Sequence, residues 1–384
     1  MDVNPPDRPT LRERFLLWRN SWLMRPAFQR AAMRLPVLRR VSQRHAASMF
    51  AVITGFVYTK TLTAVVDLGI LARLARAPAT TDALAAEAAL ESAAMARLLA
   101  AAAAIDLVER LPADSQGRPR WTLGQRGAAL AHNRGALAMI EHHKIFYDDL
   151  ADPVAMLRRG RGGGKLAAFW SYAEAAGRGE PASASDPGTA AYSALMAASQ
   201  PMVAEQVLES YDLGKHKRLL DVGGGHGAFV AEVAARHPGV GLALFDLPPV
   251  AAAARGVLDA RGLGAVEAHG GSFRDDPLPG GFDIITLVRI LHDHDDAVVA
   301  AVLAKAHDAL PLGGTLLITE PMAETPGAEA MGDAYFGLYL WAMGSGRPRS
   351  FAAYQALLAA AGFARIREVP TPLPMVTRLI TARK

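Results

Sequence analysis

The sequence predicts an α/β protein in which a mostly parallel, doubly wound sheet follows a smaller and mostly helical domain. Apolar strand patterns alternate with helical patterns over residues 218–381, as expected of a doubly wound sheet. A glycine-rich turn at residues 223–227 separates an apolar run from a helical pattern. Two short helical patterns and a hairpin pattern occupy residues 80–123. These observations together predict two domains of different construction.

Length and composition frame this prediction. The 384 residues correspond to two or three domains at roughly 150 residues each. We expect a basic arm over residues 1–45, a winged-helix domain over 46–135 and an α/β domain over 136–384. Within the last, residues 136–205 form a helical linker and pocket region. Cysteine is absent, which excludes disulfides, thiolate metal sites and a cysteine nucleophile.

The chain shows no targeting signal that would place it outside the cytoplasm. Its first eight residues do not resemble a signal peptide. No uncharged apolar run reaches transmembrane length, and the alanine-rich stretch before Ile105 is broken by Arg97. We therefore expect a cytoplasmic protein. The net charge of +4 and the isoelectric point near 9.4 are modest and do not indicate nucleic-acid binding.

The positive charge is concentrated in the first 45 residues. Ten arginines between Arg8 and Arg44 alternate there with apolar residues that include Trp18 and Trp22. A basic amphipathic segment with tryptophan can lie on an anionic membrane, which would make the protein peripheral at the inner membrane surface. The alternative is an arm that packs on a partner subunit and keeps its arginines in solvent. The sequence favours this alternative, because such segments are often solvated helix faces.

The pattern after the basic arm predicts one or two helices over residues 49–76, and then two short helices and a hairpin. Thr81 or Asp82 can cap the first short helix, and residues 114–117 form the hairpin turn. This arrangement is a winged helix. Its second helix, residues 93–104, offers one basic residue and mostly methyl groups, which suits packing rather than base reading. We therefore expect a homodimer and no nucleic-acid partner, against the alternative of a winged-helix regulator that senses a ligand.

The rest of the chain supplies helices, strands and a candidate pocket. Helical patterns cover residues 140–157 and 192–211, with a glycine-rich basic loop at 158–165 between them. The predicted strands are residues 218–222, 242–246, 265–269, 282–288, 314–319, 366–368 and 376–381. Large apolar side chains together suggest a tunnel for an apolar substrate, although core packing is the favoured alternative for each one alone: Phe146, Trp170, Tyr192, Met196, Met322, Phe336 and Met343.

The glycine turn predicts an adenosine-bearing cofactor that has no phosphates. Gly223, Gly225 and Gly227 can adopt positive φ and let a ligand approach the backbone, at the strand end where open α/β sheets bind ligands. Asp246 follows at the offset at which an acid meets ribose hydroxyls. A nicotinamide enzyme would use a similar acid, but its G-x-G-x-x-G spacing fails here at Ala228. Asp221, just before the glycines, suits a cationic methionyl group; the alternative is a turn without a ligand.

Two further side chains follow neighbouring strands and predict general-base chemistry. His292 comes just after the strand that ends at Val288, and Glu320 comes just after the strand that ends at Thr319. A histidine on this rim can accept the proton of a substrate hydroxyl, while the glutamate orients its ring and stabilises its charged form. The alternatives are metal ligands or solvated loop histidines. We assign no metal site.

Together these motifs resemble the class I S-adenosylmethionine-dependent O-methyltransferases that carry a winged-helix dimerisation domain. The resemblance rests on residues 221–227, 245–248, 271–273, 291–293 and 319–321, and it covers the chain from about Met49 to the end. It implies a Rossmann-like fold, S-adenosyl-L-methionine as cofactor, His292 as the catalytic base and Glu320 as its support. It also implies these cofactor contacts: Asp221, Gly223, Gly225, Gly227, Asp246, Leu247, Ser272, Phe273 and Arg289.

A narrower resemblance is to the hydroxyneurosporene (demethylspheroidene) O-methyltransferases of carotenoid biosynthesis. It rests on residues 18–20, 55–58, 271–279, 332–336 and 342–350, and it implies an apolar, hydroxylated polyene as substrate. Polyketides, phenols and tetrapyrroles are the alternative acceptors. The sequence departs from the broad family at three positions: Ser272 replaces an aspartate, His294 a tryptophan and Pro348 a glutamate.

Overall fold

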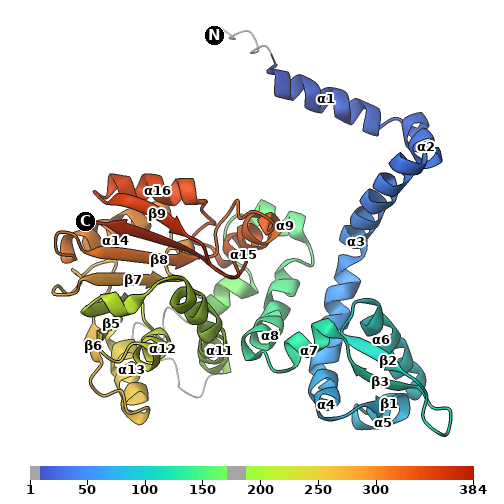
Figure 1. The fold of residues 1–384 in the computed structure, drawn as a ribbon, viewed down its shortest axis with the longest axis horizontal. Coiled ribbons are helices and arrows are strands. Elements are labelled where there is room, and N and C mark those ends of the chain that lie inside the picture. Colours follow the sequence, from blue (N-terminus) through green and yellow to red (C-terminus); the bar gives the residue numbers. More distant parts are fainter. Residues whose placement is uncertain (1–8, 171–186) are drawn as a thin grey trace. The chain divides into compact units, whose positions relative to one another are not determined.

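A computed structural model describes residues 9–170 and 187–384, with the side chains of residues 187–198 left out. The chain divides into two compact units, Met1–His132 and Asn133–Lys384 (Figure 1). The first unit is mostly helical, and the second is built on a mostly parallel sheet. The predicted fold class is thereby confirmed.

The first unit combines helices with a small antiparallel sheet in the order β1-β3-β2. Thr10 caps the first helix through a capping box with Glu13, and Pro26 and Pro36 open the next two helices at positions where proline costs no hydrogen bond. The elements are α1 (Leu11–Leu23), α2 (Pro26–Arg34), α3 (Pro36–Asp67), α4 (Ile70–Arg76), β1 (Ala79–Thr80), α5 (Thr81–Glu87), α6 (Ser92–Ala104), β2 (Val108–Leu111), β3 (Arg120–Leu123) and α7 (Gln125–Ala131).

The core of the first unit is the predicted winged helix. Buried side chains from α3 to α7 and from the sheet form one cluster around Leu84, Leu99 and Trp121. The indole nitrogen of Trp121 donates a hydrogen bond of 2.9 Å to Thr81 Oγ1, which ties the wing to the start of α5. Helix α6 buries Met95, Leu99 and Ala102 in this core.

Helix α3 is, by length and composition alone, apolar enough to cross a membrane, the only such helix among the described residues. It also contains charged residues, and the uncharged run between Arg44 and Lys60 is shorter than a membrane span, as the sequence analysis found. Thr61, Thr63 and Val65, near its end, are buried in the first unit.

The second unit contains a seven-stranded sheet in the order β6-β5-β4-β7-β8-β10-β9. The strands run parallel except for β10, which is antiparallel to β8 and β9. Strands β4, β7 and β8 are buried almost throughout, as expected of a sheet covered on both faces. The strands are β4 (Arg218–Val222), β5 (Gly241–Asp246), β6 (Glu267–Gly270), β7 (Ile284–Val288), β8 (Thr315–Glu320), β9 (Ala364–Val369) and β10 (Arg378–Arg383).

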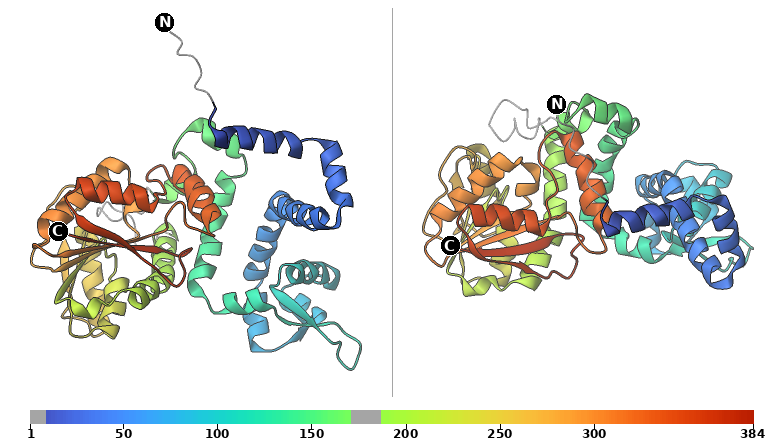
Figure 2. Two further views of the ribbon diagram at one scale, coloured as in Figure 1. Left: turned by 45° about the horizontal axis from the view of Figure 1, so that its top comes forward. Right: turned by 90° about the horizontal axis from the view of Figure 1, so that it is seen from above.

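Helices cover both faces of this sheet (Figures 1 and 2). Helices α14 and α16 pack on one face, and α11, α12 and α13 pack on the other. The predicted helix over residues 140–157 is interrupted, because Pro153 cannot continue α8 and Asp152 caps a new helix. The helices are α8 (Arg134–Asp149), α9 (Pro153–Arg159), α11 (Pro187–Ser210), α12 (Ala228–Arg236), α13 (Pro248–Ala260), α14 (Asp296–Ala309), α15 (Phe336–Met343) and α16 (Phe351–Ala360).

Candidate active site

The candidate site lies at the carboxyl ends of β4, β5, β7 and β8. The turn after β4 places Gly223 and Gly225 in the left-handed region, at φ values of 72° and 54°. A Cβ on Gly223 would lie 2.4 Å from Ile290 Cδ1, whereas a Cβ on Gly225 would meet no atom within 4 Å. The turn therefore packs tightly against the β7 loop at Gly223 and borders open space at Gly225, as a ligand-binding turn requires.

Asp246, at the end of β5, fixes this turn from the neighbouring strand. Its Oδ2 accepts a hydrogen bond from Gly225 N at 2.8 Å, and its Oδ1 accepts one from Leu247 N at 2.7 Å. Burial raises the pKa of Asp246, although both hydrogen bonds act in the opposite direction. The predicted acid thus lies directly beside the glycine turn, with both oxygens on the rim of the sheet.

Asp221 lies deeper and is left with an unsatisfied oxygen. Its Oδ1 accepts a hydrogen bond of 2.7 Å from Thr286 Oγ1, while Oδ2 has no partner among the described residues. Burial raises the pKa of Asp221 to about 7, and the nearby charge of Asp246 adds to this effect. A buried carboxylate that lacks a partner is costly in free energy. The site therefore fits a ligand that brings a cationic group to Asp221.

Three other predicted cofactor residues form local contacts in the structure. Arg289 adopts a φ of 57° just after β7, and its Nη1 donates a hydrogen bond of 3.1 Å to Ser199 Oγ on α11. Ser272 Oγ donates to Asp275 Oδ2 at 2.9 Å and so helps to close its own turn. The next residue, Phe273, packs its ring 5.3 Å from that of His294. Sequence analysis did not anticipate these partners.

His292 and Glu320 meet as predicted. His292 is buried in a short 3₁₀ turn after β7, and its Nδ1 pairs with Glu320 Oε2 at the end of β8. Glu320 Oε1 accepts hydrogen bonds from the backbone nitrogens of Ile290 at 3.0 Å and Leu291 at 2.6 Å. One buried carboxylate therefore orients both the imidazole ring and the turn that carries it, the arrangement required of a positioned general base.

The second nitrogen of His292 also has a carboxylate neighbour. Its Nε2 lies 3.1 Å from Asp293 Oδ1. Burial disfavours the imidazolium, but the charges of Asp293 and Glu320 outweigh it and raise the pKa of His292. Asp293 belongs to the motif of residues 291–293, but the sequence alone did not indicate a role for it. Its position supplies a second carboxylate for the ring.

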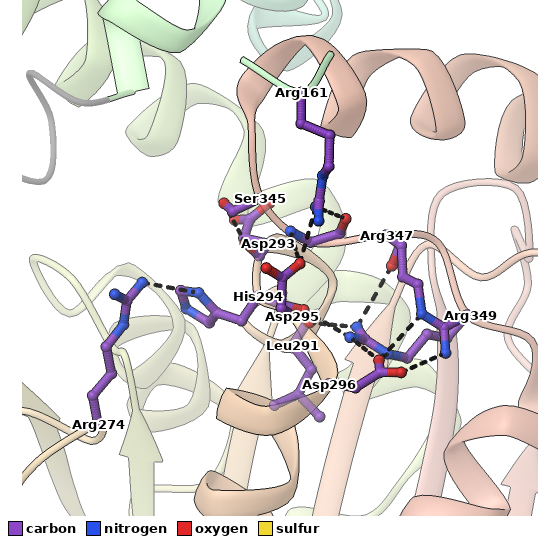
Figure 3. Close-up of polar contacts among 11 residues, drawn as sticks. Arg161, Arg274, Leu291, Asp293, His294, Asp295, Asp296, Ser345, Arg347 and Arg349 are labelled. Carbon is purple, nitrogen blue, oxygen red and sulfur yellow. Dashed lines mark hydrogen bonds and ion pairs between the residues drawn. The ribbon is translucent and has the colours of Figure 1, made fainter. Parts of the chain in front are cut away.

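Arg349 forms hydrogen bonds with the loop of residues 291–296, which carries His292 (Figure 3). It is fully buried, and its Nη1 donates to Leu291 O at 2.8 Å while its Nη2 donates to His294 O at 2.7 Å. Nη2 also reaches Asp296 Oδ1 at 2.6 Å. The hydrogen bond from Arg347, with a smaller contribution from Arg349, lowers the pKa of Asp296 to about 2. The guanidinium group of Arg349 thus binds backbone carbonyl groups before and after His292 in the chain.

The same loop is tied to two other segments of the second unit. Arg161 donates to Asp295 Oδ1 at 2.9 Å and to Gly346 O at 2.7 Å, and Ser345 Oγ donates to Asp293 O at 2.8 Å (Figure 3). A Cβ on Gly346 would lie 2.0 Å from His292 O. Sequence reasoning missed this network. The sequence feature that could have indicated this network is the pair of arginines and the pair of glycines within residues 344–350.

Four of the predicted pocket residues come together in one apolar cluster: Phe146, Trp170, Phe336 and Met343. The ring of Phe336 stands edge-on to that of His292, with centroids 5.8 Å apart. Met322 is instead buried in the core of the sheet, in keeping with the alternative of core packing. Tyr192 and Met196 lie outside the described side chains.

Two histidines of α8 add polar groups to this cluster. His142 Nε2 hydrogen-bonds Tyr339 Oη at 2.6 Å, and His143 Nε2 hydrogen-bonds Tyr335 Oη at 2.7 Å. Burial lowers the pKa of His142 to about 4, so this ring is neutral near pH 7. The cluster is therefore uncharged and mostly aromatic beside the imidazole of His292.

Comparisons with known proteins agree with this arrangement. A family model described as an O-methyltransferase domain matches residues 147–364, and one described as an O-methyltransferase dimerisation domain matches residues 50–133. The demethylspheroidene O-methyltransferase of Cereibacter sphaeroides is 44% identical over 92% of this chain and 91% of its own length. That of Rhodobacter capsulatus is 42% identical over 91% of this chain and 85% of its own length.

A solved structure shares the fold. Human N-acetylserotonin methyltransferase, solved in complex with SAM, superposes with a TM-score of 0.71 at 22% sequence identity. The similarity covers 88% of this chain and 97% of the human one. It therefore extends over both units of the present structure, each with its own architecture.

Proposed function

The chain belongs to the family of O-methyltransferases that carry a dimerisation domain, and on this premise we propose that it methylates the hydroxyl group of a hydroxycarotenoid. It is an S-adenosylmethionine-dependent O-methyltransferase. The carotenoid acceptor, such as hydroxyneurosporene or demethylspheroidene, is supported chiefly by one observation. Two demethylspheroidene O-methyltransferases are more than 40% identical over nearly all of this chain.

The residues around the glycine turn fit S-adenosylmethionine. Asp246 would accept hydrogen bonds from the ribose hydroxyls. The open space beside Gly225 would let the ligand approach the backbone of the turn. Asp221 Oδ2 would gain a cationic partner. Bound S-adenosylmethionine supplies an electrophilic methyl group on a sulfonium. We assign Arg289, Ser272 and Phe273 to the rim of the same site, with Arg289 held in place by Ser199.

His292 receives the proton that the acceptor oxygen loses. With S-adenosylmethionine bound, its sulfonium would supply the methyl group to that oxygen by in-line displacement, and the proton of the broken O–H bond would go to Nε2 of His292. Nε2 has to part from Asp293 for this, while Glu320 keeps its contact with Nδ1 and stabilises the imidazolium. An aliphatic alcohol is a much weaker acid than a phenol. Positioning of the oxygen against the methyl group therefore carries much of the rate, and the proton leaves late.

The apolar cluster suits an acceptor of this class. Phe146, Trp170, Phe336 and Met343 line one region next to His292, with His142 and His143 engaged by tyrosine hydroxyls. An uncharged, aromatic wall binds a polyene through dispersion and burial of apolar area. Met322 belongs to the core of the sheet and not to this cluster.

We infer the assembly and the location from the same family. The dimerisation domain over residues 50–133 supports a homodimer, and the fold is compatible with a cytoplasmic enzyme. We place the protein in the cytoplasm, in peripheral contact with the inner membrane, because a hydroxycarotenoid dissolves in the bilayer.

A methyl-transfer assay tests this function. Radiolabelled S-adenosylmethionine is offered with hydroxyneurosporene in detergent micelles, and in parallel with panels of phenols, polyketides and tetrapyrroles. We expect label in the carotenoid alone. His292→Ala should lower the rate by about 10²-fold, the lower end for general-base catalysis, whereas the exposed His132→Ala should leave it unchanged. Labelling of a phenol with no labelling of the carotenoid would disprove the proposed acceptor.

A further inference from the structure

The first helix carries an exposed aromatic face that the catalytic site does not use. Leu11, Phe15, Trp18 and Trp22 follow one another at intervals of four, three and four residues, so they share one face of α1. We call these four residues the aromatic stripe. The ring centroids of Phe15 and Trp18 are 6.0 Å apart, and those of Trp18 and Trp22 are 6.5 Å apart. The stripe continues into α2, where Phe28 lies 5.9 Å from Trp22.

This stripe is open to solvent over most of its area. Leu11 is 83% exposed, Phe15 57% and Trp18 59%. No residue of α1 is buried. Contiguous apolar surface of this kind marks a contact with a protein or a membrane, because a soluble surface rarely leaves it uncovered. The stripe therefore needs an occupant.

Arginine dominates the charge around the stripe. Residues 11–44 contain nine arginines and a single acid, Glu13, although the whole chain has a net charge of only +4. Among the described residues of the first unit, none of these nine arginines forms an ion pair with a carboxylate. Arg25 instead stacks on Trp22, with its guanidinium carbon 4.6 Å from the ring centroid. The segment thus presents unneutralised positive charge beside exposed indoles.

The arginines of α1 border the stripe rather than opposing it. At about 100° per residue, Arg12 and Arg19 fall along one edge of the stripe and Arg14 along the other. Glu13 and Asn20 fall on the opposite face. Long arginine side chains in such border positions can extend to a phosphate layer while the aromatic rings enter the layer below it.

We propose that α1 is a lipid-binding helix that lies on an anionic bilayer, with the aromatic stripe at the boundary between headgroups and acyl chains. Arg12, Arg14 and Arg19 then contact lipid phosphates. This inference deepens the proposed function, since a membrane-dissolved acceptor would be taken up where the enzyme docks. The contact itself requires neither acceptor nor cofactor.

A lipid surface suits α1 better than a second copy of the chain. If two copies packed the same segment against itself, arginine would meet arginine, which is unfavourable. The family model for dimerisation begins at residue 50, beyond both α1 and α2. Negative charge from lipid headgroups is complementary to the segment, and packing of the arm on the partner subunit becomes an outcome of the test.

Vesicle flotation with the full-length protein tests the proposal without substrate. Vesicles of pure phosphatidylcholine are compared with vesicles of phosphatidylcholine and phosphatidylglycerol, at low and high salt. We expect flotation only with phosphatidylglycerol, and release at high salt. Replacing Arg12, Arg14 and Arg19 by Gln should weaken binding by about fivefold per arginine. The double variant Trp18→Ala, Trp22→Ala should abolish flotation, together with the blue shift of tryptophan emission that vesicles cause in the wild type.

The matched control replaces three exposed arginines of the same unit, Arg76, Arg97 and Arg126, by Gln, and should bind vesicles as the wild type does. Every variant is checked for dimer mass by light scattering and for S-adenosylhomocysteine binding by calorimetry. Loss of the dimer in the α1 variants, equal flotation with both vesicle types, or no flotation would each overturn the proposal. A carotenoid that fails as acceptor would leave these readouts unchanged, so the two proposals fail separately.

Discussion

Glu320 holds both His292 and the turn that carries it. One carboxylate oxygen pairs with His292 Nδ1, and the other accepts hydrogen bonds from the backbone nitrogens of Ile290 and Leu291. The carboxylate therefore determines where the imidazole lies, which nitrogen faces the acceptor and how basic that nitrogen is. These three effects can be separated by removing the charge while keeping the shape.

Glu320→Gln should shift the pH dependence of turnover to lower pH. The charges of Asp293 and Glu320 raise the pKa of His292, and the neutral imidazole is the form that accepts a proton. In the wild type the rate therefore rises as the pH passes through this raised pKa. Without the charge of Glu320, the pKa falls, the rising limb moves to lower pH, and the plateau rate falls because the base is weaker.

The measurement is kcat against pH for both proteins at saturating S-adenosylmethionine. Glu324→Gln, an exposed change four residues later, serves as the control. A profile that keeps its midpoint while only the plateau falls would mean that Glu320 acts through geometry alone.

Asp246→Ala should weaken cofactor binding by about 100-fold, because hydrogen bonds to a charged group are each worth about 1.5–3 kcal/mol. The change also removes the acceptor for Gly225 N and Leu247 N. Calorimetry with S-adenosylhomocysteine measures the affinity without turnover. Asp259→Ala on the exposed side of α13 should bind normally. An affinity within threefold of the wild type would remove Asp246 from the site.

Asp221 should make cofactor binding depend on pH. Burial raises its pKa from 3.8 to about 7, so the free protein keeps a proton that the unfolded chain loses. The stability of the free protein should therefore fall as the pH rises from about 4 to about 7. A cationic ligand favours the carboxylate, so its binding should release this proton and tighten as the pH rises.

Calorimetry in two buffers with different ionisation enthalpies counts the protons released. Asp221→Asn should bind more weakly and release none through this group. Proton release that is the same in the variant and the wild type would show that Asp221 stays ionised in the free protein.

Local patterns were enough to predict the sheet and the chemical pair. Strands β4, β5, β7 and β8 are mostly apolar, and acids, glycines or a histidine lie at their ends or shortly after them. Parallel strands bring those ends to one rim, so Asp246 and Glu320 could be placed from their positions in the chain. The interruption between α8 and α9 was missed because the apolar pattern continues across Pro153.

Contacts between distant segments could not be predicted in the same way. Nothing local to Arg349 indicates that it is buried, since its partners Leu291 and His294 O lie more than fifty residues earlier. Met322 and Phe336 both follow β8, yet one is buried in the sheet core and the other faces His292. Hydrophobicity alone does not distinguish these two environments.

Arg349→Ala should lower kcat by about 10²-fold and leave the affinity for S-adenosylhomocysteine within twofold, because small displacements of reacting groups have effects of this size. The buried guanidinium fixes the carbonyl groups on both sides of His292 and contacts neither the glycine turn nor Asp246. Its loss lets the turn move while the cofactor residues stay in place. The exposed Arg347→Ala shares Asp296 as a partner and should cost much less.

Rescue by guanidinium distinguishes positioning from loss of fold. Added guanidinium ions at low millimolar concentration should restore part of kcat in Arg349→Ala, because they can occupy the cavity and bridge Leu291 O, His294 O and Asp296. A methylammonium ion, which cannot make these contacts in one plane, should not. If the variant lost cofactor affinity as well as turnover and guanidinium restored neither, Arg349 would serve the fold of the second unit rather than the position of His292.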